Sequence, residues 1–565
     1  MTTRNRTRTV LTLAAAAMAI LAIPAGAIEI PGPHELPDPD TTPPDTTRPV
    51  KVFILSGQSN MVGMGNISPL GTPGTLETIT KTDGMFPNLL DDAGAWTVRN
   101  DVMYRGVITA IGDGPLTPGV MGGTIGPELG FGHIMGYYHD EPVIVLKTSQ
   151  GNRSIGWDCL PPGSERYDYN GYTYAGYGDS PNRWLTGSGP SPYGWYAGKQ
   201  YDDYFLAESD MGPTGWADAT DYPQNCQVRH NGVVYTSKVA HTSSAASEPG
   251  IGAQSSTYWN VYSVFNVTDI LDNFSSEYPE YADQGFEIAG FGWWQGHKDQ
   301  YDASYADRYE FNLVNFINEI REYYENRYPD NIRPNAPFVV ATIGFGGVPY
   351  TPGTPYYKIY TAQMSISDPV KHPEFAGNVA SVDTLGYWRS VAESPANQGY
   401  HYNRNAETFI LVGDAMGRAI VEILTPYSVH AGDDMITWSG EPVELDATVQ
   451  EGVTVVSYAW SAHPNDGVVF SDETVEDPTV TITKDTDNPS TVKLTLTVND
   501  GENPPVTDAM TIDVYDDACK AAIGKGLAAD NPGDFDGNCI TSFADLAVMA
   551  TKWLNDTGLT GPVAK

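Results

Sequence analysis

The 565-residue chain is poor in basic residues and in cysteine, and it has only one long apolar run. It holds 31 Lys and Arg residues against 70 Asp and Glu residues, which gives a formal net charge of -39. This shortage of positive charge argues against nucleic acids and anionic membrane surfaces as partners, because both repel an acidic protein. The charge fits a soluble extracellular protein that acts on neutral material.

The long apolar run lies near the N-terminus, at residues 10–23. Arginines precede it, and Ala25-Gly26-Ala27 follows it as an A-x-A cleavage site. The run is too short for a comfortable membrane span. Residues 1–27 are therefore predicted to be a signal peptide. We expect a secreted protein, extracellular or periplasmic, with no membrane span.

The four cysteines are Cys159, Cys226, Cys519 and Cys539. Export permits disulfides, and four cysteines allow three pairings. Because the first two lie in one region of the chain and the last two in another, we expect Cys159–Cys226 and Cys519–Cys539 bonds. The alternative is that the thiols are buried and unpaired.

A chain of this length is expected to hold several domains, because single hydrophobic cores rarely exceed about 250–300 residues. Residues 28–49 are rich in Pro, Asp and Thr, which predicts an extended linker without a core. From residue 50 onward, apolar runs typical of buried strands alternate with helical patterns, which predicts a parallel α/β domain over residues 50–425. Strands are expected at 52–55, 142–147, 287–291 and 338–343, and helices at 304–328 and 409–424.

The most informative stretch is residues 52–61, which read VFILSGQSNM. The strand breaks beside a glycine, where a tight turn can lift the Ser59 hydroxyl clear of the sheet. The N–H groups that follow, near a helix N-terminus, can face a developing oxyanion. The run GQSNM resembles the first motif of the SGNH-type carbohydrate esterases, the sialate O-acetylesterase and acetylxylan esterase group known as carbohydrate esterase family 6. The plain alternative is a strand followed by a polar turn.

Further motifs resemble those of the same family and occur in the family's order: GPELG at 126–130, GNRSIGW at 151–157 and WWQGHKD at 293–299, followed by GYHYN at 399–403. The resemblance covers about residues 50–425, apart from an insert. It implies an SGNH-hydrolase fold, a flavodoxin-like three-layer α/β domain, and a serine carboxylic ester hydrolase that needs no cofactor for catalysis. By position in these motifs, Ser59 is the expected nucleophile and His401 the expected base. The expected oxyanion donors are Gly151 or Asn152 and the side chain of Gln295.

The chain departs from the family pattern at both usual acids. Gln398 stands where the last motif normally has Asp, and His297 stands where the W-x-Q-G motif is normally followed by Glu. We hypothesise that Asp299 orients His401 instead, with Glu128 and then Asp383 as further candidates. His297 either takes part in proton transfer or acyl contact, or simply lines the cleft. Residues expected in the cleft are Gln58, Asn60, Glu128 and His297.

Residues 212–262 interrupt the α/β pattern and read as a small inserted β module. An Asn231-Gly232 turn between β-rich flanks predicts a hairpin. The order of Trp216, NGxxY, AHTS, EPG and Trp resembles chitin-binding type 3 modules, whose exposed aromatic rings stack on sugars. Trp216, Tyr235 and Trp259 are the expected carbohydrate-binding residues. The alternative is that these three rings form the core of the unit.

Residues 427–516 carry short alternating runs separated by turn signals, which predicts an all-β sandwich. The sequences Tyr458-Ala-Trp460 and VNDG at 498–501 resemble polycystic-kidney-disease-type (PKD), immunoglobulin-like domains of secreted enzymes. A spacer without chemistry is expected here.

Residues 517–565 contain oxygen side chains at loop positions 1, 3, 5 and 12 before a helix, as in EF-hand and dockerin calcium loops. A structural calcium ion and a cohesin-like or cell-surface partner are the expectations for this dockerin-like segment. Cys539 replaces the usual loop glycine, and only one loop is found where dockerins have two. The alternative is an acidic helix cap held by Cys539. The expected ligands are Asp534, Asp536, Asn538 and Asp545.

Together these features predict a secreted carbohydrate O-acetylesterase that forms an acyl-enzyme at Ser59 and acts on an acetylated polysaccharide or glycan. One alternative is a glycan-binding protein on a catalytically impaired esterase scaffold, because both usual acids are missing. Another is an esterase for sialic-acid O-acetyl groups. The sequence leaves the polymer and the acyl group open.

Overall fold

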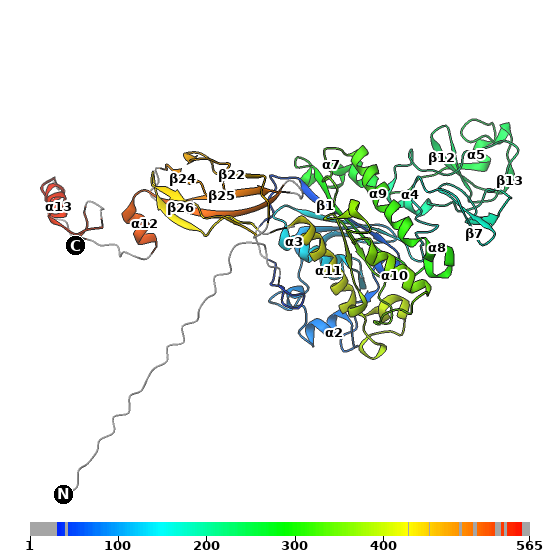
Figure 1. Cartoon of the computed structure of the whole chain (residues 1–565), viewed down its shortest axis with the longest axis horizontal. Helices are drawn as coiled ribbons and strands as arrows, with labels where there is room; N and C mark the ends of the chain where they lie inside the picture. Colours follow the sequence, from blue (N-terminus) through cyan, green and yellow to red (C-terminus); the bar gives the residue numbers. More distant parts are fainter. Residues whose placement is uncertain are drawn as a thin grey trace, which may run out of the picture. The chain divides into compact units, whose positions relative to one another are not determined.

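The computed structural model describes residues 31–39, 43–425, 427, 429–450, 453–484, 489–500, 505–525, 533–535 and 539–555. The predicted signal peptide lies outside these residues. The chain divides into two compact units, Glu29–Pro426 and Tyr427–Lys565 (Figure 1), which are described separately below.

The first unit is built on a seven-stranded sheet with the order β17-β16-β15-β1-β6-β3-β4. All neighbouring strands pair in parallel except β3 and β4, which are antiparallel. The strands are β1 (Val50–Gly57), β3 (Arg99–Ile108), β4 (Asp113–Leu116), β6 (Val143–Ser149), β15 (Phe286–Trp294), β16 (Phe338–Ala341) and β17 (Val379–Val382). A mixed, mainly parallel α/β sheet is thereby confirmed. The strands β3, β4 and β17 were not predicted.

The chain order of the strands creates a switch point beside β1. From β1 the chain first forms β3 and β4 at one edge of the sheet and returns to form β6 directly beside β1. It then crosses to the other side of β1 to form β15, β16 and β17 in turn. In open α/β sheets ligands bind where the strand order reverses, at the carboxyl ends of the strands. This places the expected site where β1 and β15 end, next to Ser59.

Both faces of the sheet are buried, because successive side chains of each strand enter different cores. Val52 and Ile54 of β1 belong to one hydrophobic cluster, whereas Phe53 and Leu55 belong to the other. All four are fully buried. A strand buried on both sides reads as a continuous apolar run, which is why 52–55 was recognisable.

Helices α3 (Glu128–Tyr138) and α11 (Ala406–Leu424) cover one face of the sheet together. Their backbones approach very closely, because a Cβ atom on Gly413 would lie 1.9 Å from the Pro127 carbonyl oxygen. Figure 1 shows the two helices side by side against the sheet. The expected helix at 409–424 is confirmed and begins three residues earlier, where Asn405 caps it by accepting from the Thr408 N–H.

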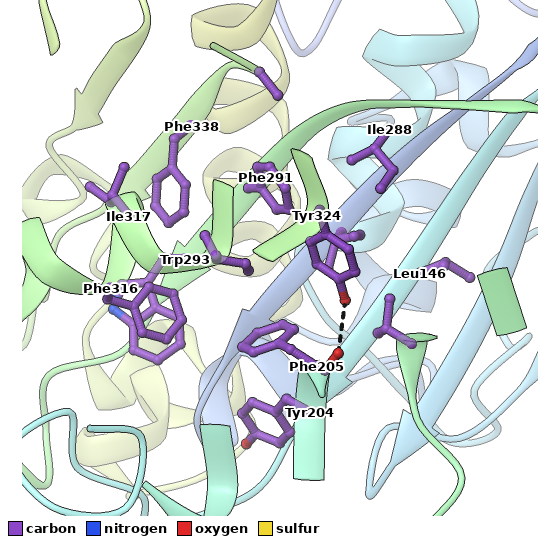
Figure 2. Close-up of a cluster of buried hydrophobic side chains, with 14 of the residues drawn as sticks. Leu146, Tyr204, Phe205, Ile288, Phe291, Trp293, Phe316, Ile317, Tyr324 and Phe338 are labelled. Atoms are coloured by element: carbon purple, nitrogen blue, oxygen red, sulfur yellow. Dashed lines mark hydrogen bonds between the residues drawn. The ribbon is translucent and has the colours of Figure 1, made fainter. Parts of the chain in front are cut away.

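The opposite face is covered by α4 (Lys199–Phe205) and α9 (Tyr309–Arg327), with α10 (Pro355–Ser365) beside α9. Figure 2 shows their aromatic packing, in which Phe316 lies against Trp293 with ring centroids 4.4 Å apart. The Tyr324 hydroxyl donates to the Phe205 carbonyl at 3.4 Å and links α9 to the end of α4. The expected helix at 304–328 is divided, because non-helical backbone at Arg308 separates α8 (Ala303–Asp307) from α9.

The stretch predicted as a coreless linker packs onto the first unit where it is described. Leu36 is 6% exposed and joins the cluster of α3 and α11. The Pro37 carbonyl accepts from the Tyr137 hydroxyl, and the Asp45 N–H donates to the Asp140 carbonyl at 2.6 Å. The prediction of a linker without a core is therefore wrong for this part. One leucine among prolines was too weak a signal of burial.

The 212–262 stretch forms two small antiparallel sheets, β10-β13 and β11-β12-β14. The predicted hairpin is confirmed, with Asn231 and Gly232 both at positive φ in the two-residue turn. Trp259 is 3% exposed and packs on Tyr222 in the core of the module, so its expected role as an exposed sugar platform is wrong. Trp216 and Tyr235 are partly buried against the same core. The strands are β10 (Asp221–Tyr222), β11 (Gln227–His230), β12 (Val233–Ser237), β13 (His241–Thr242) and β14 (Trp259–Val261).

The expected Cys159–Cys226 disulfide is absent, and both thiols are free and buried. Cys159 lies in the large core beneath the sheet, whereas Cys226 lies in the separate small core of the 212–262 module. Closeness along the chain did not bring them together because each was drawn into a different core. Burial raises the pKa of both thiols.

The described residues of the second unit form two larger β-sheets around one apolar core, as the alternating pattern predicted, and a two-stranded sheet of β18 (Val429–His430) and β21 (Thr448–Val449). Trp460, Leu494 and Ile512 are among the buried residues of that core. One sheet has the order β19-β26-β25-β22 and the other β20-β24-β23. Their strands are β19 (Met435–Trp438), β20 (Pro442–Glu444), β22 (Ser457–His463), β23 (Val468–Phe470), β24 (Thr479–Ile482), β25 (Ser490–Asn499) and β26 (Val506–Tyr515).

The C-terminal segment holds α12 (Ala518–Gly524) and α13 (Phe543–Asn555). The predicted Cys519–Cys539 disulfide is present. Of the four expected calcium ligands, Asp536 and Asn538 lie outside the described residues. Asp545 accepts hydrogen bonds from the N–H groups of Phe535 and Ser542, and Asp534 accepts from the Cys539 N–H. These bonds resemble the helix-cap alternative, and calcium binding stays a prediction.

Among the described residues, no helix is both long and apolar enough to cross a membrane.

Candidate active site

Ser59 lies at the carboxyl end of β1, as the first residue of the short helix α1 (Ser59–Val62). Gly57 ends the strand where its neighbour β15 comes closest, because a Cβ atom there would lie 2.2 Å from the Trp294 carbonyl oxygen. The chain then turns at Gln58, whose N–H donates to the same carbonyl at 3.2 Å. Ser59 is 9% exposed. The backbone thus places the serine directly at the switch point of the sheet.

The loop after β6 passes beside Ser59. A Cβ atom on Gly151 would lie 3.8 Å from Ser59 Cβ, so the two residues are neighbours in space. Asn152, next in the chain, is exposed and has a left-handed φ of 59°. The structure therefore brings the Gly151 and Asn152 backbone, expected to carry oxyanion donors, to the serine.

Two side chains beside Ser59 link this turn to other parts of the site. Asn60 Nδ2 donates to the Tyr400 carbonyl at 3.3 Å, which connects α1 to the His401 loop. Gln58 Oε1 accepts from the Lys298 N–H and from Gln295 Nε2, both at 3.4 Å. Both residues were predicted to lie in the cleft. The Gln58 bonds hold the end of β1 against the residues that follow β15.

His401 lies in a strained turn just before α11. The three residues after it, Tyr402, Asn403 and Arg404, have left-handed φ values of 49°, 53° and 60°. Each such non-glycine residue costs of order 1–3 kcal/mol, and the surroundings must offset that cost. Tyr402 is fully buried and its hydroxyl accepts from the Gly344 N–H at 2.8 Å, which fixes the turn to the loop after β16.

The imidazole of His401 is paired with a neutral amide. Its Nδ1 lies 3.1 Å from Gln398 Oε1, an atom that can only accept, so Nδ1 carries the proton and Nε2 the lone pair. Burial, with smaller contributions from Arg404 and His297, lowers the pKa of His401 to about 4. A neutral imidazole with a free Nε2 lone pair is the form that can accept a proton from a hydroxyl.

Asp299 does not reach His401 through its hydrogen bonds. Its carboxylate accepts from Gln295 Nε2 at 2.6 Å and from the N–H groups of Gly156 and Ile155 at 2.9 and 3.2 Å. The hypothesis that Asp299 orients His401 is therefore not borne out by these contacts. Its bonds instead hold the loop after β6 against the segment that follows β15.

Gln295 connects the same groups from the other side. Besides Asp299, its Nε2 donates to the Arg153 carbonyl at 2.7 Å, and its Oε1 accepts from the Tyr309 hydroxyl at 2.9 Å. An amide nitrogen has two donors. Both donors of Gln295 Nε2 are used in short bonds, to Asp299 and to the Arg153 carbonyl. In this structure Gln295 therefore holds the Arg153 backbone and does not have the expected role of an oxyanion donor. Sequence reasoning missed Tyr309.

Asp299 and Glu128 have different electrostatic surroundings. Burial raises the pKa of Asp299 to about 7, against the lowering effect of its three hydrogen bonds. Glu128, expected in the cleft, is 2% exposed and lies 2.5 Å from Lys147 Nζ. Glu128 thus belongs to a buried ion pair that contacts the end of α1 through Lys147. Lys147 was not recognised as its partner from the sequence, because it lies within an apolar strand.

Asp383, the weakest candidate partner for His401, is exposed at the end of β17 and accepts from the Leu385 N–H at 2.9 Å.

His297 lies in a cluster of polar and aromatic side chains beside the His401 loop. Its Nδ1 is 2.9 Å from the Tyr356 hydroxyl and 3.1 Å from Gln300 Nε2, and its Nε2 is 3.3 Å from the Tyr301 hydroxyl. Because an amide nitrogen can only donate, Nδ1 is the acceptor and the imidazole is neutral. The ring stacks on Tyr400, with centroids 5.9 Å apart. These contacts show that His297 orders the polar and aromatic side chains beside the His401 loop.

Comparison with known proteins does not assign the chain to a family. No family model and no curated protein matches it. Among solved structures, a protein from Arabidopsis thaliana is 13% identical, with 66% of this chain and 98% of that chain covered and a TM-score of 0.31. A PKD domain is 24% identical, with 15% of this chain and 83% of that chain covered and a TM-score of 0.14. At these TM-scores neither similarity assigns a fold or a function.

Proposed function

We propose that the protein is a secreted serine carboxylic ester hydrolase that removes O-acetyl groups from a carbohydrate. The observation that carries this proposal is the position of Ser59. It begins α1 at the switch point of a parallel sheet, it has Gly151 beside it, and α1 is tied to the His401 loop through Asn60. The α/β domain of residues 50–425 is assigned the SGNH-hydrolase fold under the same proposal.

In the proposed reaction the Ser59 hydroxyl attacks the acetyl carbonyl while His401 Nε2 takes its proton. The backbone N–H groups of Ser59 and of the Gly151–Asn152 turn stabilise the oxyanion of the tetrahedral intermediate. The sugar hydroxyl leaves with the proton held by His401, and an acetyl-enzyme remains. Water then attacks this ester, His401 takes the water proton, and acetate and free Ser59 are released.

The neutral Gln398 supports a specific form of this mechanism. A carboxylate in that position would stabilise the imidazolium that forms in the transition state, whereas an amide only holds the ring in the productive tautomer. We therefore expect an esterase of modest rate that works with a weak base. Loss of one oxyanion donor typically lowers kcat by about 10²–10³-fold. We therefore expect the N–H donors of the Gly151–Asn152 turn to supply a large share of the rate.

The decisive measurement is acetate release from acetylated xylan and from 4-nitrophenyl acetate by the full chain and by Ser59→Ala. Release by the wild type that disappears in Ser59→Ala, with an unchanged thermal unfolding curve, supports the serine esterase. Equal release by both proteins would overturn it, because the serine would then have no role.

A glycan-binding protein on an impaired esterase scaffold is the second candidate, and the Gln398–His401 pair is the observation that favours it. It predicts no acetate release by the wild type but retained binding of an oligosaccharide in calorimetry. Under either function the 212–262 module is proposed to contact glycan through Trp216 or Tyr235. The PKD-like unit is proposed as a spacer, and the C-terminal segment as a calcium-dependent attachment to a cohesin-like or cell-surface partner.

A further inference from the structure

Helix α4 is buried along its whole length and reaches the candidate active site through one of its tyrosines. All seven of its residues are buried, and Tyr204, near the end of the helix (Figure 2), is fully so. The Tyr204 hydroxyl donates to the Gly57 carbonyl at 3.1 Å. Gly57 ends β1 and lies two residues before Ser59. A side chain of α4 therefore holds the backbone that leads directly into the proposed nucleophile.

The same hydroxyl lies at the ends of two neighbouring strands. Gly57 of β1 pairs with Ser149 of β6, and Gln150 follows Ser149 directly. Burial raises the pKa of the Tyr204 hydroxyl well above its usual value, so the hydroxyl stays protonated and remains a donor. A hydrogen bond with the Gln150 backbone is among the smaller, opposing effects on this pKa. Tyr204 thus contacts the strand that leads to Ser59 and the residue that precedes the Gly151–Asn152 turn.

A second side chain of α4 holds the residue that follows this turn. Gln200 Oε1 accepts from Arg153 Nε at 2.7 Å, and the Gln200 N–H donates to the Asp158 carbonyl at 2.8 Å. Gln200 is 2% exposed, so water has little access to these bonds. The turn that is proposed to supply oxyanion donors is therefore flanked by two contacts with α4, from Tyr204 before it and from Gln200 after it.

Two adjacent buried carboxylates fix α4 itself. Asp202 accepts from the hydroxyls of Tyr177 and Tyr196 at 2.6 and 2.7 Å. Asp203 accepts from the Tyr262 hydroxyl at 2.7 Å. A fully bonded polar network in a buried place rigidifies the element that carries it. A rigid element is the support that a reactive constellation needs to keep its geometry to within about 0.5 Å.

We propose that Tyr204 and Gln200 are positioning residues that set the place of Ser59 relative to the N–H donors of the Gly151–Asn152 turn. The inference rests on the proposed esterase function and adds two residues that none of the family-like motifs contains. Neither side chain contacts the substrate in this scheme, because both act through the backbone of the turn or of β1. A misplacement of about 1 Å can cost about 10²-fold in rate. Loss of either contact should therefore lower kcat and leave KM nearly unchanged, because the oxyanion forms only in the transition state.

The first test is Tyr204→Phe, which removes the hydroxyl and keeps the ring. Tyr201→Phe is the matched control, because Tyr201 is fully buried in the same helix and its hydroxyl has no hydrogen-bond partner among the described residues. Tyr324→Phe controls for the loss of a buried hydroxyl-to-carbonyl bond as such, since its hydroxyl donates to Phe205. With 4-nitrophenyl acetate we expect kcat to fall about tenfold or more in Tyr204→Phe, with KM within about twofold of the wild type. Both controls should keep kcat within about twofold of the wild type.

The second test separates hydrogen bonding from packing at position 200. Gln200→Met fills a similar volume but removes the acceptor for Arg153, so kcat should fall as in Tyr204→Phe. Gln200→Glu keeps an oxygen that can accept from Arg153 and should recover most of the lost kcat. Equal kcat values in Gln200→Met and the wild type would overturn the role of Gln200.

Crystal structures of the wild type, Tyr204→Phe and Tyr201→Phe provide a readout that does not depend on turnover. We expect the backbone of residues 57–59 and the Gly151–Asn152 turn to shift relative to each other in Tyr204→Phe alone. An unchanged backbone together with equal kcat in Tyr204→Phe and Tyr201→Phe would overturn the positioning role while leaving the esterase intact. No hydrolysis by the wild type, with the backbone shift present in Tyr204→Phe, would instead overturn the esterase and with it the catalytic meaning of the contacts.

Discussion

Lys147 Nζ donates to the carbonyl oxygen of Val62, the last residue of α1, at 2.9 Å. The same ammonium is paired with Glu128 at 2.5 Å, and the two side chains are 0% and 2% exposed. The second Glu128 oxygen accepts from the Gly126 N–H at 2.8 Å. A buried ion pair therefore supports the short helix that begins with Ser59. The pair joins β6 to the first residue of α3.

Removing one partner of this pair should be severely destabilising. Glu128→Gln leaves the Lys147 ammonium buried without its counter-charge, which typically costs about 3–5 kcal/mol in the free energy of unfolding. Urea unfolding at pH 7 measures that loss. The double variant Lys147→Met/Glu128→Leu should recover most of it, because it removes both charges. A loss below about 1 kcal/mol in Glu128→Gln would contradict the structural role assigned to the pair.

A carboxylate at position 398 should strengthen the base. In the wild type the pKa of His401 is lowered to about 4, so the acidic limb of the kcat/KM profile is expected near that pH. Gln398→Asp places a negative charge near Nδ1, favours the imidazolium and should move this limb upward by about 1–2 in pH. We also expect a higher kcat at pH 7–8. Gln398→Asn is the control, since it changes length without adding charge. An identical limb in all three proteins would show that His401 is not the titrating group.

Asp299 should make the protein less stable as the pH rises towards neutrality. Burial raises the pKa of its carboxyl from 3.8 to about 7, so between these values the folded state holds a proton that the unfolded state has released. Its contribution is fully present below about pH 4 and is lost as the pH passes about 7, with a slope of at most about 1.4 kcal/mol per pH unit. The unfolding free energy of Asp299→Asn, subtracted from that of the wild type, should show this slope. The same difference for the exposed Asp383→Asn should be flat, and a flat result for Asp299→Asn would refute the prediction.

Replacement by alanine should have different effects at the two tryptophans Trp216 and Trp259 of the 212–262 module. Trp259 is buried and its Nε1 donates to the Ser247 carbonyl at 2.7 Å. Trp259→Ala should cost about 3–5 kcal/mol and expose the module to protease. Trp216→Ala removes a ring that is only partly buried, so the module should stay folded while any glycan affinity falls. Limited proteolysis and calorimetry with chito-oligosaccharide distinguish the two, and equal protease sensitivity of both variants would be the contrary result.

The α/β architecture could be predicted because local patterns carry it. The run at 52–55 is buried on both faces, so it is apolar at every position. The helix at 409–424 shows an apolar pattern with helical spacing. Strand β3, by contrast, includes Arg99, Asn100, Asp101 and Arg105. These polar residues concealed the strand, because the sequence does not show which groups pair with them when they are buried. Arg99, for example, is buried through bonds to Asp101 and to the His133 carbonyl.

The candidate site was only partly predictable for a similar reason. The motifs located Ser59, the Gly151 turn and the His401 loop, since each follows the end of an element that the sequence reveals. The motifs did not reveal which hydrogen-bond donor or cation each carboxylate contacts. Asp299 bonds to the backbone of residues 155 and 156, and Glu128 bonds to Lys147, because burial forces each charge to find the nearest donors.

The sequence by itself determined the buried strands near 52–55, 142–147, 287–291 and 338–343, the helix at 409–424, the hairpin at Asn231-Gly232 and the Cys519–Cys539 bond, all of which depend on short-range patterns. Only the tertiary structure decided that Cys159 and Cys226 stay apart, that Trp259 is core, and that residues 31–39 pack on the domain. These outcomes depend on which distant segments pack in the same core. The topology of the chain decides this, and the residues that neighbour each position in the sequence do not.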